Sequence, residues 1–191
     1  GISCLPLEMV RPAKKAITVS RSFGKLVGTL EGMCEAVALY AARAAEKLRR
    51  ERLAAGALMI FILTNRFRDE PQYSNSATIE LPVPTDSTDE ITAYALRCLR
   101  GIYRKGFRFY KTGIILSGLV PASQVQTGLF DTVDRDRAKR LMRALDDVNF
   151  RMGAGALAFA ASGLERPWKT RFNRRSPRYT TRWDELRVVE T

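Results

Sequence analysis

The sequence predicts an α+β fold in which four strands form one sheet and two helices cover one of its faces. Apolar residues follow two different periods, two residues for strands and 3.6 for helices, and the segments come in the order β-α-β-β-α-β along residues 17–116. With 46% hydrophobic and 27% charged residues, the chain can bury a core in spite of its formal net charge of +12. Its 191 residues fit one domain or one domain with a substantial appendage.

The first half of this unit contains three strands and a helix. Residues 17–23, ITVSRSF, alternate β-branched or aromatic residues with polar ones, which predicts a strand. A long amphipathic helix follows, because apolar residues recur at helical spacing from Met33 up to Gly56. Residues 57–64, ALMIFILT, are apolar on both faces and predict a central strand. Residues 76–81 alternate as its neighbour, after a polar loop.

The second half adds one helix and one strand. Ser87 followed by Glu90 indicates a capping box, and helical periodicity continues from there until Gly106. Residues 107–116, FRFYKTGIIL, are aromatic and β-branched and predict the last strand. We expect a first domain at residues 1–120 on this basis.

The remainder of the chain predicts a small mixed α/β tail domain at 133–191, after a linker at 121–132 without charge over most of its length. A helix is expected at 134–150 and a short strand at 156–162. An arginine-rich segment interleaved with aromatic residues then runs from Leu164 to Asp184. The apolar side of the predicted helix consists of Ala138, Leu141, Leu145 and Val148.

Composition excludes several function classes. The sequence has no histidine, which rules out Ser-His-Asp and Cys-His nucleophiles and every histidine-containing metal site. Cys4, Cys34 and Cys98 are odd in number and never spaced as C-x-x-C, so a disulfide framework or a four-thiolate site is not available. We therefore expect a reducing cytoplasmic location, without a targeting or membrane segment.

Positive charge is spread over both parts of the chain. Residues 1–120 hold 18 basic and 11 acidic residues, and residues 121–191 hold 14 and 9, so the net charges are +7 and +5. A long basic surface favours a polyphosphate partner, because neutralised phosphates release condensed counterions. The alternative is a protein whose basic residues are merely solvated.

The first predicted strand and its continuation place hydroxyls, cations and a glycine within six residues. These are Ser20, Arg21, Ser22, Gly24 and Lys25. Hydroxyls and backbone amides donate to phosphate oxygens, and a glycine lets a sugar-phosphate backbone approach closely. An ordinary edge strand with a polar outer face explains the same pattern. No Walker motif is present, since an upstream glycine and a following Ser or Thr are both missing.

Further cations extend this predicted DNA-binding surface without forming a motif of their own: Arg66, Arg68 and Lys111. Residues 105–110, KGFRFY, resemble the start of the RNA-recognition signature. That signature belongs on the third strand, whereas here it opens the fourth, so single-stranded RNA binding is a weaker alternative.

A short motif in the linker matches the bacterial sliding-clamp pentapeptide, Gln-x-x-Leu-Phe. Gln126 supplies the amide that fixes orientation, and Leu129 and Phe130 supply adjacent apolar anchors for a pocket. Packing of the two apolar residues against the following helix is the alternative. Thr127 departs from the commoner Gln-Leu-x-Leu-Phe, and Gly128 adds flexibility that is lost on binding, so we expect modest affinity.

Catalytic carboxylates are not evident. Polymerases and nucleases need acidic side chains that converge on two metal ions about 4 Å apart. The adjacent acidic pairs, namely Asp69-Glu70, Asp89-Glu90, Asp146-Asp147 and Asp184-Glu185, lie in predicted loops or on predicted helices, where neighbouring side chains point apart. Caps and salt bridges explain them better, so we expect no enzyme activity from this chain by itself.

The sequence resembles the C-terminal part of UmuC-type Y-family translesion DNA polymerases. The resemblance rests on ITVSRSFGKLV, on FRFYKTGIILSGLVP, on QTGLF and on SPRYTTRWDEL at 176–186, and it spans nearly the whole chain. It implies that residues up to about 120 form a little finger domain that grips primer-template DNA, and that Gln126, Leu129 and Phe130 dock on the β sliding clamp. It also implies UmuD′ and RecA as partners and a role in SOS mutagenesis.

The resemblance also implies that the catalytic domains, with their Mg²⁺-binding carboxylates, precede Gly1. We therefore expect a fragment that needs no cofactor and binds DNA without polymerising nucleotides. The rival hypothesis is a protein-interaction module whose basic surface meets acidic partners.

Overall fold

The computed structural model describes residues 13–126, 128, 131, 133–170 and 176–186. The predicted β-α-β-β-α-β order is confirmed, and a third helix follows it. The elements are β1 (Ile17–Val27), α1 (Leu30–Arg50), β2 (Leu53–Thr64), β3 (Ser74–Thr85), α2 (Thr88–Ile102), β4 (Phe109–Pro121) and α3 (Arg135–Met152). Short 3-10 turns occur at Ala122–Gln124, Ala160–Ser162 and Trp183–Glu185.

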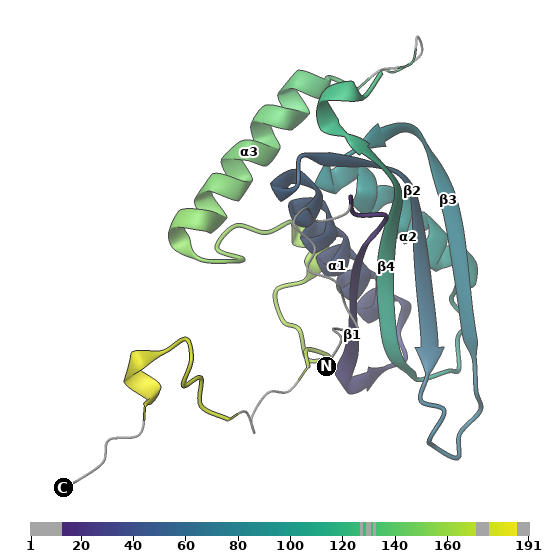
Figure 1. The fold of residues 1–191 in the computed structure, drawn as a ribbon. Coiled ribbons are helices and arrows are strands. Elements are labelled where there is room, and N and C mark those ends of the chain that lie inside the picture. The colour runs from purple at the N-terminus through teal and green to yellow at the C-terminus, as the bar shows by residue number, and fades with distance from the viewer. Residues whose placement is uncertain (1–12, 127, 129–130, 132, 171–175, 187–191) are drawn as a thin grey trace, which may run out of the picture.

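The four strands form one antiparallel sheet with the order β1-β4-β2-β3. The predicted central position of the second strand is confirmed, since β2 pairs with both β3 and β4. Helices α1 and α2 pack side by side on one face of this sheet (Figure 1). No helix in the described part of the chain covers the opposite face, which we call the open face.

The core lies between the sheet and these two helices. Alternation along the central strands sends every second side chain under the helices, where Leu58, Ile60, Ile114 and Leu116 are fully buried. Helix α1 contributes a row of small residues that lets it approach the sheet closely. That row is Ala36, Ala41, Ala44 and Ala45.

Helix α1 ends earlier than its apolar period predicts. Its N-cap is Thr29, whose hydroxyl accepts a hydrogen bond from the Gly32 N–H at 3.2 Å, and the helix ends at Arg50 rather than near Gly56. Arg52 has a positive φ of 55° and turns the chain directly into β2. Pairing of residues 53–55 with β4 outweighs the local helical pattern there.

The predicted capping box at α2 is wrong. Ser87 is the N-cap residue, but its side chain caps no backbone N–H and bonds instead to the carboxylate of Asp89. Glu90 does not reach back to Ser87, because it binds the hydroxyl of Thr85 and, at 2.7 Å, the guanidinium of Arg135 at the start of α3. A tertiary ion pair has replaced the local cap.

Helix α3 docks beside α1 through one arginine. Arg49 makes two hydrogen bonds to the carboxylate of Asp146, at 2.6 and 2.7 Å, and a third to the Thr88 hydroxyl at 3.0 Å. Met142, one turn before Asp146, is the apolar anchor of this face and is 2% exposed. The predicted anchor Leu141 is 58% exposed, because the ion pair sets a different rotation of the helix.

The tail has no strand at 156–162 among its described residues, which corrects the prediction of a mixed α/β unit there. Backbone groups of this segment form hydrogen bonds with a side chain instead of with a neighbouring strand. The amide of Asn149 donates to the Leu157 carbonyl and accepts from the Leu157 N–H, both at 2.9 Å. A 3-10 turn at Ala160–Ser162 then leads the chain back to the sheet.

Trp168 fastens the tail to the first domain. It is 4% exposed and packs edge-on against Phe23 and Tyr40, with ring centroids 5.9 and 6.1 Å apart. Its indole N–H donates to the Glu35 carboxylate at 3.2 Å. Tyr40 is equally enclosed, and burial raises its pKa to about 12. We call Trp168 and these three partners the tryptophan anchor.

Candidate nucleic-acid interface

The open face is rich in hydroxyls at its edges and apolar in its middle. The register places Ser20 and Ser22 of β1 beside Gly113 and Lys111 of β4. Phe61 of β2 lies over Gly113, where an added Cβ would come within 2.6 Å of the Phe61 ring and 2.5 Å of Ser20 Cβ. Only a glycine at this position therefore leaves room for the Phe61 ring and the Ser20 side chain.

Arg21 does not share this face with the two serines. It pairs with Thr112, which is fully buried beneath the helices, so alternation puts Arg21 on the helix side of the sheet. Its charge acts there on Tyr40, whose pKa it lowers against the larger effect of burial. The structure thus separates Arg21 from the other predicted DNA-binding residues of β1.

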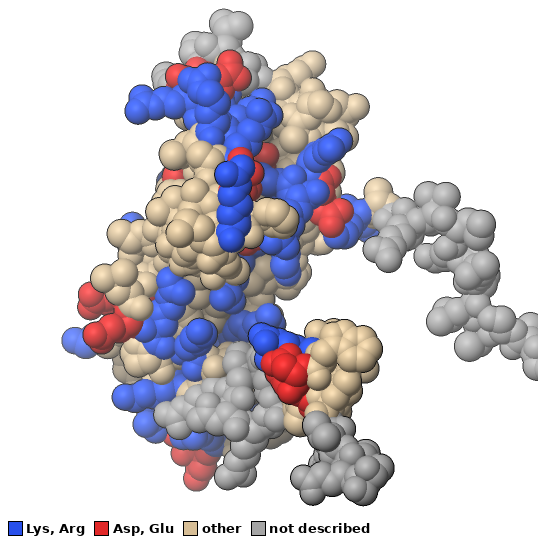
Figure 2. All heavy atoms as spheres, turned by 90° about the vertical axis from the view of Figure 1, so that its left-hand side faces the viewer, with Lys and Arg blue, Asp and Glu red and all other residues tan. Residues whose placement is uncertain are grey.

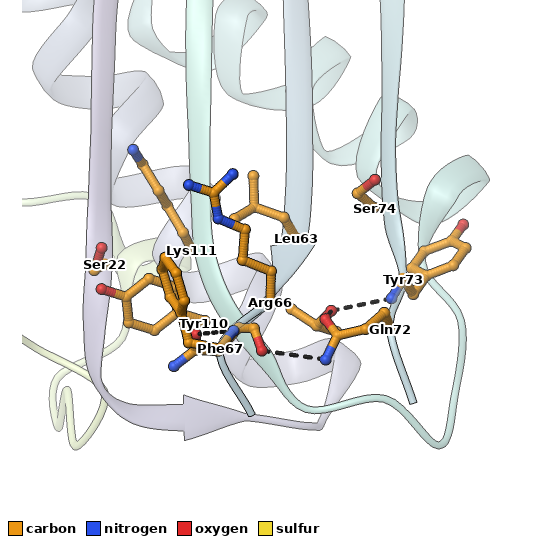
Figure 3. Close-up of a pocket in the computed structure, with 11 residues that line it drawn as sticks. Ser22, Leu63, Arg66, Phe67, Gln72, Tyr73, Ser74, Tyr110 and Lys111 are labelled. Atoms are coloured by element: carbon orange, nitrogen blue, oxygen red, sulfur yellow. Dashed lines mark hydrogen bonds between the residues drawn. The ribbon is translucent and has the colours of Figure 1, made fainter. Parts of the chain in front are cut away.

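A hollow of about 620 Å³ lies at one end of the open face. The predicted residues Ser22, Arg66 and Lys111, far apart in sequence, all line it (Figure 3). Arg66 belongs to the loop between β2 and β3, and Lys111 lies on β4 beside Ser22 of β1. Pairing of β1 with β4 and the turn after β2 therefore bring these three residues together.

A second hollow, of about 500 Å³, adjoins the first and holds Gly24, Lys25 and Arg68. Asn65 and Tyr110 line both. The backbone of β1 is already occupied here, since the Gly24 N–H donates to the Trp168 carbonyl at 3.0 Å. This amide is therefore not free to donate to a phosphate while the tail stays docked, and the predicted role of Gly24 in close approach of a DNA backbone stays a prediction.

Some cations of the two hollows are paired with a carboxylate and others are not. Glu70 binds Arg108 at 2.6 Å and lies 3.5 Å from Arg68, so one carboxylate offsets part of their charge. Among the described residues, no carboxylate lies within salt-bridge distance of Lys25, Arg66 or Lys111. We call these three residues the cation triplet, because no described carboxylate offsets their charge.

Lys and Arg side chains also gather on the side of the molecule that carries α3 (Figure 2). Arg137, Lys139 and Arg140 of that helix are exposed. Charge alone therefore does not single out the open face, which differs in combining cations with hydroxyls, aromatic rings and a hollow.

The RNA-type signature is not displayed on the open face. Phe109 is fully buried under the helices, and Phe107 packs against Tyr73 with ring centroids 5.0 Å apart. Only Tyr110 of its aromatic residues lines the hollow. The order and direction of these side chains disfavour the RNA-binding alternative.

Sequence reasoning missed Phe67, which lines the same hollow and is 83% exposed. The available signal was an aromatic residue between two arginines in an otherwise polar loop, NRFRDE. A single exposed apolar residue is ordinary on a protein surface, so the informative observation is that this ring lines the same hollow as Arg66 and Lys111.

The clamp motif is only partly described. Gln126 and Gly128 are both exposed, a few residues after the end of β4 at Pro121. The predicted anchors Leu129 and Phe130 lie outside the described residues, so the structure does not test their role.

The described residues show no metal site and no membrane span. No three acidic, cysteine or histidine side chains in the described ranges come close enough to hold a metal ion. No described helix is both long and apolar enough to cross a bilayer. The two described cysteines, Cys34 and Cys98, are free thiols whose pKa is raised by burial, and Cys4 lies outside the described residues.

Comparison with known proteins gives two family matches. The model of the impB/mucB/samB family C-terminal domain matches residues 14–129, and a domain of unknown function, DUF4113, matches residues 139–189. The protein UmuC of Salmonella typhimurium strain LT2 is 42% identical over 192 residues, which cover 100% of this chain and 46% of that protein.

Two further relatives extend the comparison. The protein ImpB of Salmonella typhimurium is 40% identical over 97% of this chain and 44% of its own length. A DNA polymerase IV of Desulfatibacillum aliphaticivorans is 30% identical over 78% of this chain and 37% of its own length. The chain thus spans less than half the length of each of these relatives.

Proposed function

We propose that this chain, which belongs to the impB/mucB/samB family and contains its C-terminal domain, is the DNA-binding and clamp-docking region of an error-prone translesion DNA polymerase. The parent polymerase would act in SOS mutagenesis in the cytoplasm, as the family resemblance implies. The relationship to a DNA polymerase IV supports a polymerase parent.

The cation triplet is the observation that carries the DNA-binding proposal. Lys25, Arg66 and Lys111 are free of carboxylates among the described residues and lie at one end of an open, hydroxyl-bearing sheet. Cations release counterions from phosphates, while serine hydroxyls such as Ser20 and Ser22 position the backbone by hydrogen bonds. Neither contact reads a base, so we expect binding with little sequence preference.

The other predicted contacts have smaller roles. Arg68 shares Glu70 with Arg108, so phosphate must compete with a carboxylate there. Arg21 faces the helix side and lies outside the proposed surface. Gly24 is available only for close approach, because its N–H is bound to the tail.

The clamp-docking part of the proposal rests on the pentapeptide and its setting. Gln126 is exposed just beyond the sheet and follows the 3-10 turn at Ala122–Gln124. The Ala122 N–H donates to the Arg52 carbonyl at 2.9 Å, which holds this segment beside the start of β2. A peptide anchored at one end can reach a pocket on a large partner without disturbing the sheet. The β sliding clamp is the proposed partner.

Catalysis would belong to parts of the parent that this chain does not contain. We propose that the Mg²⁺-binding carboxylates lie in a preceding palm domain, and that UmuD′ and RecA meet the parent on surfaces that no residue here identifies. This chain would contribute grip on primer-template DNA and attachment to the clamp.

A salt titration tests the DNA-binding proposal. Fluorescence anisotropy would measure the affinity of the chain for two primer-templates of unrelated sequence between low and moderate salt. Neutralising three phosphates predicts a slope of log K against log salt of about −2.7, with nearly equal affinities for the two sequences. A flat slope, or a strong preference for one sequence, would refute backbone-dominated binding and favour an acidic protein partner for the basic surface.

A further inference from the structure

Phe67 presents an aromatic ring to solvent at the edge of the larger hollow. Its side chain is 83% exposed, although burying a phenylalanine is worth about 1.5–3 kcal/mol. The ring lies in the loop between β2 and β3 and lines the same hollow as Tyr110 (Figure 3). No packing requirement of the first domain explains a phenylalanine here.

The loop that holds Phe67 is internally fixed rather than loosely exposed. The side-chain amide of Gln72 donates to the carbonyl oxygens of Asn65, Arg68 and Glu70, at 3.2, 3.0 and 2.8 Å. Its oxygen accepts from the Thr64 hydroxyl at 2.7 Å. One side chain therefore ties both ends of the loop together, so that the ring position is set before any ligand arrives.

The surroundings of the ring combine cations with apolar lining. The Arg66 guanidinium carbon lies 4.9 Å from the ring centroid, which adds a cation to the aromatic surface. Leu63 and Tyr110 supply further apolar lining, and Lys111 supplies a second unpaired cation. A hollow of about 620 Å³ lies within the usual size range of small-molecule sites.

We propose that Phe67 stacks on an unpaired base of single-stranded DNA while Arg66 and Lys111 hold the adjoining phosphates. A duplex is a poor partner for the ring, because the faces of paired bases are covered by their neighbours. An unstacked base offers a free π-face to an aromatic side chain, whatever its identity. The inference rests on the proposed function and assigns the single-stranded template, rather than the duplex, to this hollow.

Alanine substitution of Phe67 tests the assignment. Anisotropy with the full chain would compare a labelled single-stranded oligonucleotide with a blunt duplex of equal length. Stacking contributes about 1–3 kcal/mol per base, so Phe67→Ala is expected to weaken single-strand binding about 5- to 140-fold. Blunt-duplex binding and both salt slopes are expected to stay unchanged, because the substitution removes no charge.

Matched variants separate stacking from other effects. Phe150 lies on α3, is 89% exposed and lines neither hollow, so Phe150→Ala should alter neither affinity. Phe67→Tyr should retain single-strand binding, whereas Phe67→Leu, which is apolar without a π-face, should lose most of it. Because the ring is exposed, none of these changes is expected to unfold the chain.

The outcomes distinguish the inference from the proposed function. If Phe67→Ala weakens single-strand and duplex binding equally, or weakens neither, the stacking assignment is wrong, while a steep salt slope would still support backbone binding. If Phe67→Leu binds as well as the unaltered chain, the ring acts as an apolar contact and stacking is again excluded.

Discussion

A chain with Gln126→Ala, Leu129→Ala and Phe130→Ala is expected to lose measurable binding to the β sliding clamp. In the proposed docking mode the amide would orient the peptide and the two apolar side chains would fill the pocket, so the substitution removes all three proposed anchors together. Truncation of an interface anchor typically costs about 2 kcal/mol or more, and two such losses already weaken binding about a thousandfold. Surface plasmon resonance with immobilised clamp would measure the change.

The sequence supplies a matched control two residues upstream. Gln124 is also an exposed glutamine of the same segment, so Gln124→Ala removes an equivalent side chain outside the motif. Its clamp affinity should remain within about twofold of the unaltered chain, since surface substitutions away from contacts have small effects. Clamp binding that survives the triple substitution would place the docking site elsewhere in the chain.

Trp168→Ala is expected to release the tail from the first domain without unfolding the sheet. Truncation of a buried tryptophan costs about 3–5 kcal/mol, and the substitution also leaves Glu35 without its indole partner. Hydrogen exchange should accelerate along the tail and at the Gly24 amide, which loses its carbonyl acceptor. Amides of the central strands β2 and β4 should keep their protection.

The chain has a second tryptophan that serves as a control. Trp183 is 88% exposed, so Trp183→Ala should leave the exchange of both parts unchanged. Unaltered exchange in Trp168→Ala would mean that the Arg49–Asp146 ion pair and Met142 are enough to hold the tail. Loss of protection in β2 and β4 would instead show that tail and sheet unfold as one unit.

Local patterns predicted the four strands and the first two helices well, because strand alternation and helical periods agree there with the tertiary contacts. They failed where distant residues decide. Arg52 turns the chain into β2 before the helical period ends, and Glu90 leaves the predicted capping box for Arg135 on a helix 45 residues away. In the tail, Asn149 pairs with the Leu157 backbone in place of a strand.

The sequence predicted which residue types the candidate site contains, but not which of these residues the fold brings together. A sequence run such as Ser20-Arg21-Ser22 groups residues that alternation then distributes over two faces of the sheet. Conversely, Arg66 lies near Lys111 and Ser22 only because the loop between β2 and β3 and the pairing of Ser22 with Lys111 are at the same end of the sheet. In the sequence, Trp168 is one of several aromatic residues in an arginine-rich segment. In the structure it is buried and anchors the tail.

The most direct test of the account is to remove the cation triplet and compare it with an equal loss of charge elsewhere. Lys25, Arg66 and Lys111 would be replaced together by alanine, and a control chain would lose the three exposed cations of α3, namely Arg137, Lys139 and Arg140. Both variants lose three of the positive charges that give the unaltered chain its formal net charge of +12. Primer-template affinity would then be measured against salt concentration.

If the open face holds the DNA backbone, the first variant binds weakly and its salt slope becomes shallower by about 2.7, or about 0.9 for each phosphate contact removed. The α3 control keeps the slope of the unaltered chain. Equal losses of slope in the two variants would contradict the account, because the total positive charge rather than the open face of the sheet would then determine DNA binding.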